Sequence, residues 1–243
     1  FVLTTGVPCC LIVRQALLSR SGADGNLEWY PPGHLLLWLA GYALVMMVGF
    51  GVIAGAFFGD IFQDMSTMLD ELAEAERGTA MGPYFELLAS PPVKDTFLKM
   101  LPGAMAISWI LLMVINAALA QGALSAIGKA QRPNPRMADI DLPVWASLAL
   151  IGSLAMASLF GGIIGLAATT ITLVALILFT FCGMGIVHAI LLDRAARIPV
   201  LVGVYILLTI LFWPVFFIAG LAVLEPWMGL KRRLAVQPPN QNS

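Results

Sequence analysis

The sequence predicts an all-α protein, a polytopic transmembrane helical bundle of about five full helices. Four long stretches contain no Asp, Glu, Lys or Arg, namely residues 31–59, 100–128, 142–192 and 198–224. About 20 apolar residues cross the hydrocarbon core, so the stretch 142–192 holds two helices and each of the others holds one. The composition agrees, because 60% of the residues are hydrophobic and 11% are charged, whereas soluble domains contain about 25% charged residues.

The expected helices follow these stretches in chain order. Residues 1–13 are apolar and are followed at once by Arg14, which predicts the closing half of a transmembrane helix that begins upstream. Full helices are expected at 34–58, 101–124, 143–160, 166–192 and 198–224. Pro102 is expected in the first turn of its helix, and Pro214 is expected to kink the last one. Residues 1–230 then form a single transmembrane domain, and residues 231–243 form a basic, disordered tail.

Residues 60–99 form a polar insertion that carries eight acidic and three basic side chains. The apolar residues at its start recur at helical spacing, opposite the acids, and predict an amphipathic helix that ends at Gly78. We expect this helix to lie along the membrane surface with Met65, Met68 and Leu72 buried. Pro83 and the pair at 91–92 are expected to break the chain after it.

The membrane orientation depends on how the basic residues are divided between the two faces. Strict alternation of the helices puts seven Lys and Arg on one face and six on the other. Short loops weigh most in the positive-inside rule, which favours the first set as cytoplasmic. The basic tail argues the other way, and a re-entrant pair of helices broken at Trp213 and Pro214 would reconcile the two.

Small residues recur every four positions in two of the expected helices. Gly51, Gly55 and Gly59 form one stripe, and the second stripe consists of Ala118, Gly122, Ala126 and Ala130. Such stripes let two helices approach closely, and dense packing replaces the hydrophobic drive that lipid cannot supply. Packing within the bundle is the favoured interpretation, and a docking face for a partner membrane protein is the alternative.

Few polar residues lie inside the expected helices. Asn116 and His188 are candidate intramembrane polar residues, and Arg194 follows the fourth full helix. Asn116 serves either as a hydrogen-bonding contact between helices, which is favoured, or as a ligand contact. No Asp, Glu, Lys or Arg lies at mid-membrane, which argues against ion-coupled transport by this chain alone.

Two short motifs match enzyme signatures, and neither enzyme function is favoured. His188 and Asp193 match the HxxxxD pattern of acyltransferases, but five residues on a helix rotate the pair apart by roughly 140°. Asp60 and Asp64 match the DxxxD magnesium motif of membrane prenyltransferases, but the facing carboxylate pair is expected on the opposite side of the membrane. No catalytic, cofactor-binding or metal-ligating residue is therefore predicted.

Charge and cysteine content exclude other classes of function. A formal charge of −1 leaves no basic face for nucleic acid. Cys9, Cys10 and Cys182 lack the spacing of a disulfide framework or a metal site, and small apolar packing residues are the favoured interpretation.

The chain resembles the YybS-like family of uncharacterised bacterial polytopic membrane proteins. The resemblance rests on the acidic segment before Leu101, the stretch 116–122 that leads to a basic joint, the stretch 185–188 that runs into Arg194, and the basic ending 227–233. Such proteins are thought to be distantly similar to the S-components of energy-coupling-factor transporters and to MreD. The resemblance implies further helices upstream, and it brings neither a catalytic residue nor an assigned substrate.

The favoured function is that of a non-catalytic subunit or scaffold of the bacterial inner membrane that docks to other membrane proteins. The alternative is a solute-binding transport subunit of the S-component type, and the third hypothesis is a membrane lipid enzyme. The expected partners are the lipid bilayer and membrane proteins, without nucleic acid and without a cofactor.

Overall fold

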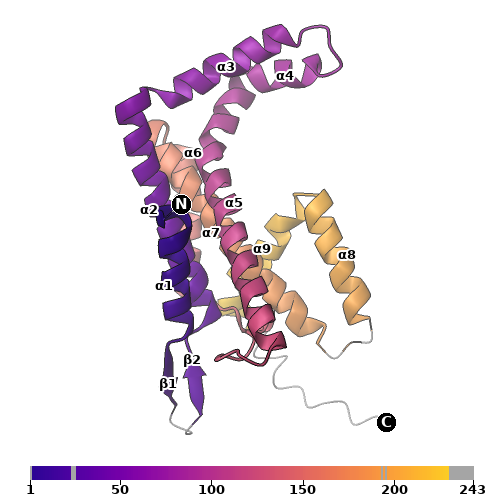
Figure 1. Ribbon diagram of the computed structural model, residues 1–243. Coiled ribbons are helices and arrows are strands. Elements are labelled where there is room, and N and C mark those ends of the chain that lie inside the picture. Colours follow the sequence, from indigo (N-terminus) through magenta and orange to yellow (C-terminus); the bar gives the residue numbers. More distant parts are fainter. Residues whose placement is uncertain (1, 23–25, 193, 195, 230–243) are drawn as a thin grey trace. The chain divides into compact units, whose positions relative to one another are not determined.

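A computed structural model describes residues 2–22, 26–192, 194 and 196–229 (Figure 1). The expected disordered tail, 231–243, lies outside the described residues. In chain order the elements are a π-helical turn η1 (Val2–Gly6), α1 (Val7–Ala16), β1 (Ser19–Ser21), β2 (Leu27–Trp29), α2 (Pro32–Phe58), α3 (Ile61–Ala75), α4 (Gly82–Ala89), α5 (Pro91–Ala126), a 3-10 turn η2 (Met137–Asp139), α6 (Val144–Leu159), α7 (Gly162–Ile190), α8 (Arg197–Ile210) and α9 (Pro214–Met228). The all-α class is confirmed.

The two strands form a small antiparallel hairpin that the sequence analysis did not predict. Arg20 pairs with Glu28 in the register, and the Arg20 Nε and Glu28 Oε2 atoms lie 2.7 Å apart. Gly22 donates its N–H to the Asn26 carbonyl (2.8 Å) and closes the loop. Each strand has three residues and is largely exposed, so the hairpin is a local turn within the polar joint and does not alter the class.

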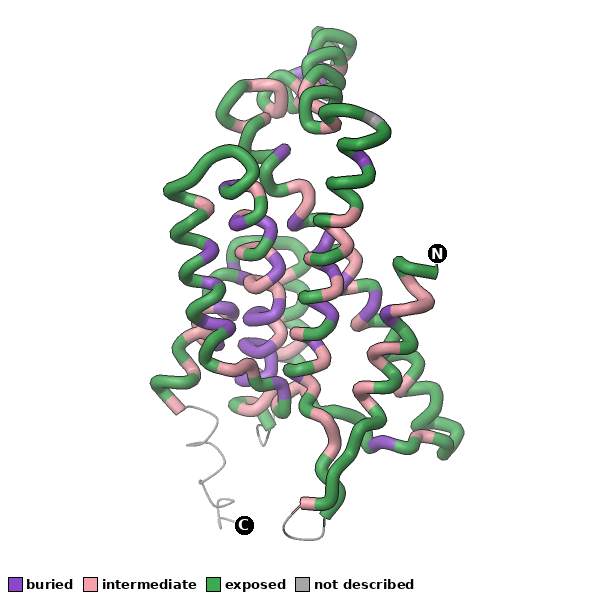
Figure 2. Tube along the Cα trace, turned by 90° about the vertical axis from the view of Figure 1, so that its left-hand side faces the viewer, coloured by how far each residue is buried: buried purple, intermediate pink, exposed green. Residues whose placement is uncertain are grey.

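Three helices among the described residues are long and apolar enough to cross a membrane: α2, α5 and α7. Helices α8 and α9 pass the same test only as a pair, and they are bent by 118° at a short break (Figure 1). The sequence predicted a kink at Pro214, but the chain turns back on itself instead. Helix α6 and the helix at the start of the chain are apolar but shorter. Many large apolar residues of these helices are exposed, and Figure 2 shows exposed positions along much of the helical trace. Such surfaces are expected where lipid covers a helix.

The chain divides into two compact units. One contains residues 1–40, 112–150 and 175–243, and the other contains residues 41–111 and 151–174. Helices α2, α5, α6 and α7 each contribute one end to each unit. The division therefore passes through continuous helices and does not follow a linker.

Helix α5 begins ten residues earlier than predicted. Pro91 and Pro92 do not break the chain; they occupy the first helical positions, where a missing N–H costs nothing. The Ser90 carbonyl accepts the first helical hydrogen bond, from Lys94 N (2.9 Å). Pro102 consequently lies inside the helix rather than in its first turn.

The corner between α2 and α3 is built by two consecutive residues. Gly59 has a positive φ of 80° and terminates α2 in the left-handed conformation that glycine adopts at low cost. Asp60 then caps α3, because its Oδ1 accepts hydrogen bonds from Phe62 N (3.1 Å) and Gln63 N (3.2 Å). The amphipathic helix predicted from residue 60 to residue 78 is thus observed as α3, three residues shorter at its end.

The burial predicted for α3 is correct only in part. Met65 and Leu72 are half-buried, Ala73 is buried, and Met68 is 59% exposed. Helix α4, which the sequence analysis did not predict, packs against α3, and together they form a helical hairpin. Lys94, in the first turn of α5, places its Nζ 2.8 Å from both carboxylate oxygens of Asp70 on α3.

Candidate functional site

The most specific polar cluster in the described residues surrounds Arg132, in the joint between α5 and α6. The residue is buried, with 8% of its surface exposed. Nη1 donates to the Ala16 carbonyl at the end of α1 (3.1 Å), and Nη2 donates to the Tyr30 carbonyl just before α2 (2.9 Å). The Arg132 carbonyl in turn accepts a hydrogen bond from Gln121 Nε2 on α5 (2.8 Å). One residue therefore joins three segments that are far apart in the sequence.

The partners of Arg132 are peptide carbonyls rather than carboxylates. Ala16 is the last residue of α1, where the final carbonyls have no partner in the helix and carry the negative end of its dipole. A buried guanidinium satisfies such groups well, because its donors are fixed in a planar fork. Burial lowers the pKa of Arg132 from its ordinary value, yet an arginine pKa starts so high that the group stays charged at neutral pH.

The same joint lies against the second half of α7. The Cys182 Sγ donates to the Ile140 carbonyl (3.3 Å), and a Cβ at Gly185 would collide with the Met137 carbonyl oxygen. A Cβ at Gly33, at the start of α2, would likewise collide with the Asp141 carbonyl oxygen. Residues 137–141 thus form a backbone wedge that requires glycine on two different helices.

Helix α9 approaches α7 equally closely. A Cβ at Gly183 would overlap the Ile218 carbonyl oxygen, and the buried residues of α9 are Pro214, Val215, Ala219 and Ala222. Positions 183 and 185 are rotated by about 200° around the helix. Helix α7 is therefore contacted on opposite sides by α9 and by the wedge.

Arg132, Gly183 and Gly185 are not among the site residues predicted from the sequence. The two glycines form a G-x-G pattern in an apolar helix. Together with the small residues of α9, this pattern could have indicated that the backbone of another segment lies close to α7. No local pattern marks Arg132, because its neighbours in the joint include two other bases, Lys129 and Arg136.

The predicted polar residues do not form one site. His188 is half-buried; its Nδ1 donates to the Met184 carbonyl (2.9 Å), and its ring meets the Tyr205 ring on α8 edge to face, with centroids 6.0 Å apart. Asn116 and Arg194 are exposed. Asp193, the second residue of the HxxxxD pattern, lies outside the described residues.

Within the described part of the chain, the glycines of the small-residue stripes have open space beside them. Among the described atoms, none lies within 4 Å of a Cβ built at Gly51, Gly55 or Gly122. Gly59 terminates α2, so the first stripe consists of two glycines only. The remaining members of the second stripe, Ala118, Ala126 and Ala130, are not buried, and Ala130 lies beyond the end of α5.

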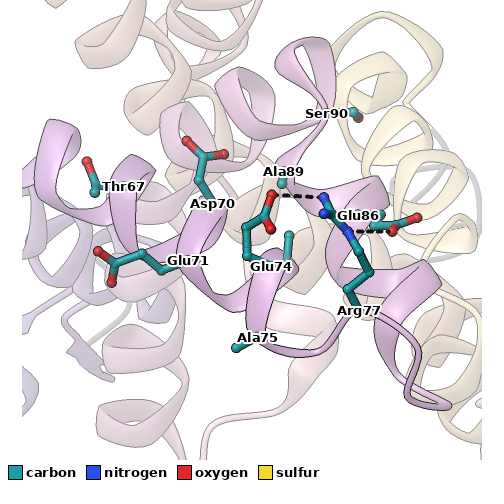
Figure 3. Close-up of a pocket in the computed structure, with 10 residues that line it drawn as sticks. Thr67, Asp70, Glu71, Glu74, Ala75, Arg77, Glu86, Ala89 and Ser90 are labelled. Carbon is teal, nitrogen blue, oxygen red and sulfur yellow. Dashed lines mark hydrogen bonds and ion pairs between the residues drawn. The ribbon is translucent and has the colours of Figure 1, made fainter.

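Helices α3 and α4 border an open groove of about 840 Å³, and the charged residues in its lining are four acids and one arginine (Figure 3). Arg77 lies between two of its carboxylates: its Nη2 is 2.8 Å from Glu74 Oε1, and its Nε is 3.9 Å from Glu86 Oε1. All three side chains are more than half exposed, so these ion pairs contribute little to stability. Asp70 and Glu71 complete the acidic lining.

Within the described part of the chain, no group of three or more His, Cys, Asp or Glu residues is placed to hold a metal ion. Comparisons with protein-family models, with curated proteins and with solved structures found no match.

Proposed function

We propose that this chain is an integral membrane subunit that docks to other membrane proteins and does not itself catalyse a reaction. The observation that carries the proposal is the open glycine face of α2. Gly51 and Gly55 are one helical turn apart on a helix long enough to span a membrane, and no described atom occupies the space beside them. In lipid, such a face gains attraction chiefly when a second helix packs closely against it.

The membrane architecture belongs to the same proposal. We place five membrane segments in the chain. Helices α2, α5, α6 and α7 are full transmembrane spans, the bent α8–α9 pair is the fifth segment, and α1 is a shorter apolar segment before them. The supporting observations are the three long apolar helices and the bent pair. Helix α6 has 16 residues and is about 24 Å long, so the bilayer would have to thin locally around it. The proposal also includes two points that rest on the sequence motifs given above: the chain lies in the bacterial inner membrane, and it belongs to the YybS-like family.

The test compares two substitutions on adjacent residues of α2. Gly55→Leu fills the open face, whereas Ala56→Leu adds a similar volume to an exposed position rotated by about 100° around the helix. Each variant is purified from native membranes in mild detergent, and the copurifying proteins are quantified by mass spectrometry. We expect Gly55→Leu to lose a membrane protein that Ala56→Leu retains.

The structure supplies the folding control for this test. Because no described atom lies within 4 Å of a Cβ at Gly55, the Gly55→Leu variant should unfold at the same temperature as the parent chain. Equal recovery of every copurifying protein with both variants would contradict the docking function.

A further inference from the structure

Helices α8 and α9 are each too short to cross a bilayer. They contain 14 and 15 residues, so each is about 21–23 Å long at 1.5 Å per residue. The hydrocarbon core is about 30 Å thick. Joined end to end they would be long enough, but the 118° bend at residues 211–213 turns α9 back towards the start of α8.

The bend limits how deep the pair can reach. When the two arms lean equally away from the bilayer normal, each is tilted by about 31°, and the tip lies about 18 Å below the point where the chain enters. That depth is slightly more than half of the hydrocarbon core. A pair of this geometry enters one leaflet, reaches the middle of the bilayer and returns.

The surface of the pair suits such a position. Helix α8 has no buried residue within the structure, and its exposed side chains include Ile198 (74%) and Ile210 (75%). The break carries the exposed side chains of Phe212 and Trp213, and their rings contact those of two further aromatic residues, Phe216 and Phe217. Lipid chains would cover this apolar surface.

The net charge is positive at both ends of the pair, although Asp193 stands beside the bases at one end and Glu225 at the other. Arg194 and Arg197 precede or begin α8, and no charged residue occurs from residue 198 to residue 224. Lys231, Arg232 and Arg233 follow Gly229 in the sequence. Basic side chains at both ends match the anionic headgroups of a cytoplasmic leaflet.

We propose that α8 and α9 form a re-entrant hairpin embedded in the cytoplasmic leaflet, so that Arg197 and Gly229 lie at the same membrane face. The inference rests on the membrane placement proposed above. Its lipid partner is the leaflet with anionic headgroups. Contact with α7 at Gly183 and at His188 holds the two arms of the hairpin.

The hairpin determines on which membrane face the basic residues at the end of the chain lie, a question that the sequence alone left open. Each full span carries the chain from one face to the other, so the joints after α1, α5 and α7 share a face. Contacts agree with this grouping, since Arg132 binds the carbonyls of Ala16 and Tyr30 and Ile140 binds Cys182. If α8 and α9 form a re-entrant hairpin, the residues after Gly229 are on the same side of the membrane as these three joints.

Ten of the thirteen Lys and Arg residues then lie on one face, with six acids, which gives a net charge of +4. The opposite face holds residues 60–99, which include the α3–α4 hairpin and the start of α5 and carry eight acids and three bases, a net charge of −5. A single transmembrane crossing by α8 and α9 would move the three terminal bases to the acidic face and weaken this asymmetry. The positive-inside rule assigns the face with ten bases to the cytoplasm.

The test determines, for each of three single-cysteine variants, on which side of the membrane the cysteine is accessible to a reagent. The parent carries Cys9→Ser and Cys10→Ser and retains Cys182, which is buried. The probes are Ala80→Cys between α3 and α4, Ala196→Cys before α8, and Ser243→Cys at the end of the chain. A membrane-impermeant maleimide is applied to intact bacterial spheroplasts and, separately, to lysed membranes. The parent without an added cysteine measures background labelling.

We expect Ala80→Cys to be labelled in intact spheroplasts, and Ala196→Cys and Ser243→Cys to be labelled only after lysis. Labelling of Ser243→Cys but not Ala196→Cys in intact spheroplasts would overturn the hairpin. Labelling of both in intact spheroplasts, without Ala80→Cys, would overturn the cytoplasmic assignment.

Membranes are also separated from the soluble fraction before labelling. This step distinguishes an error in the hairpin or its leaflet from an error in the proposed function. Recovery of the chain in the soluble fraction would overturn the membrane subunit itself. A chain that stays in the membrane but labels in the wrong pattern overturns the hairpin or its leaflet and leaves the docking proposal standing.

Discussion

A single buried side chain, Arg132, holds the ends of α1 and α5 and the start of α2 together. Replacing it by methionine keeps an unbranched side chain of similar length but removes the donors to the Ala16 and Tyr30 carbonyls. We expect Arg132→Met to lower the free energy of unfolding by about 2–3 kcal/mol, because hydrogen bonds to charged groups contribute about 1.5–3 kcal/mol each and the loss of a buried charge offsets part of that. Thermal unfolding in detergent micelles measures the change.

Arg136→Met is the matched control for this prediction. Arg136 lies four residues along the same joint, its side chain is 78% exposed, and its ion pair with Asp139 is 3.5 Å long. Removing an exposed pair of this kind changes stability by at most about 1 kcal/mol. Equal destabilisation by the two variants would show that the carbonyl contacts of Arg132 do not stabilise the joint.

Glycine residues of this chain differ sharply in what surrounds them. An alanine Cβ at Gly183 would overlap the Ile218 carbonyl, which belongs to the backbone of α9 and cannot move aside alone. We expect Gly183→Ala to destabilise the chain by about 1–3 kcal/mol. Gly55→Ala meets open space and should be neutral or stabilising by up to about 1 kcal/mol, through helix propensity. Unfolding temperatures that rank the two variants in the opposite order would contradict the observed α7–α9 contact.

At the scale of the element, the break before α9 decides whether one helix or two are present. Pro214 has no N–H to donate to the Ile210 carbonyl, and its ring would clash with that carbonyl in a continuous helix, at a cost of about 3 kcal/mol. We expect Pro214→Ala to let part of the population form one continuous span. Labelling of Ser243→Cys in intact spheroplasts should then rise.

Pro226 supplies the control for that experiment. It lies inside α9, which continues through it, so Pro226→Ala should leave the labelling of Ser243→Cys unchanged. Unchanged labelling in the Pro214→Ala variant would show that the contacts between α9 and α7, rather than the proline, maintain the break.

Element boundaries show where local sequence signals succeeded and where they did not. The start of α2 and both ends of α6 lie within two residues of the bounds predicted from apolar stretches, whereas α7 begins four residues earlier and ends two residues earlier than predicted. The break predicted at Pro91 and Pro92 is wrong, because a proline pair is compatible with either a break or a helix start. The distinction lies in whether Ser90 accepts the first helical hydrogen bond. Helix α4 was missed because its eight residues are too few for a clear periodicity.

At the scale of the whole molecule, the all-α class and the membrane-length helices could be predicted from the sequence alone. The physical reason is that a charged side chain is costly in hydrocarbon wherever it stands, so the stretches that can lie in lipid are visible as gaps in the charge. This property depends on each residue and its neighbours along the chain. The acidic segment was recognised in the same way, and the cap at Asp60 is equally local.

The tertiary structure alone decided which small and polar residues are in contact. The stripe at Gly51 and Gly55 and the close-packed Gly183 and Gly185 are both glycine patterns in apolar helices, and they differ only in what another part of the chain places beside them. Arg132 acquires its role from carbonyls 116 and 102 residues away in the sequence. Such contacts are a property of the folded arrangement, because burial and hydrogen-bond geometry are determined between segments rather than within them.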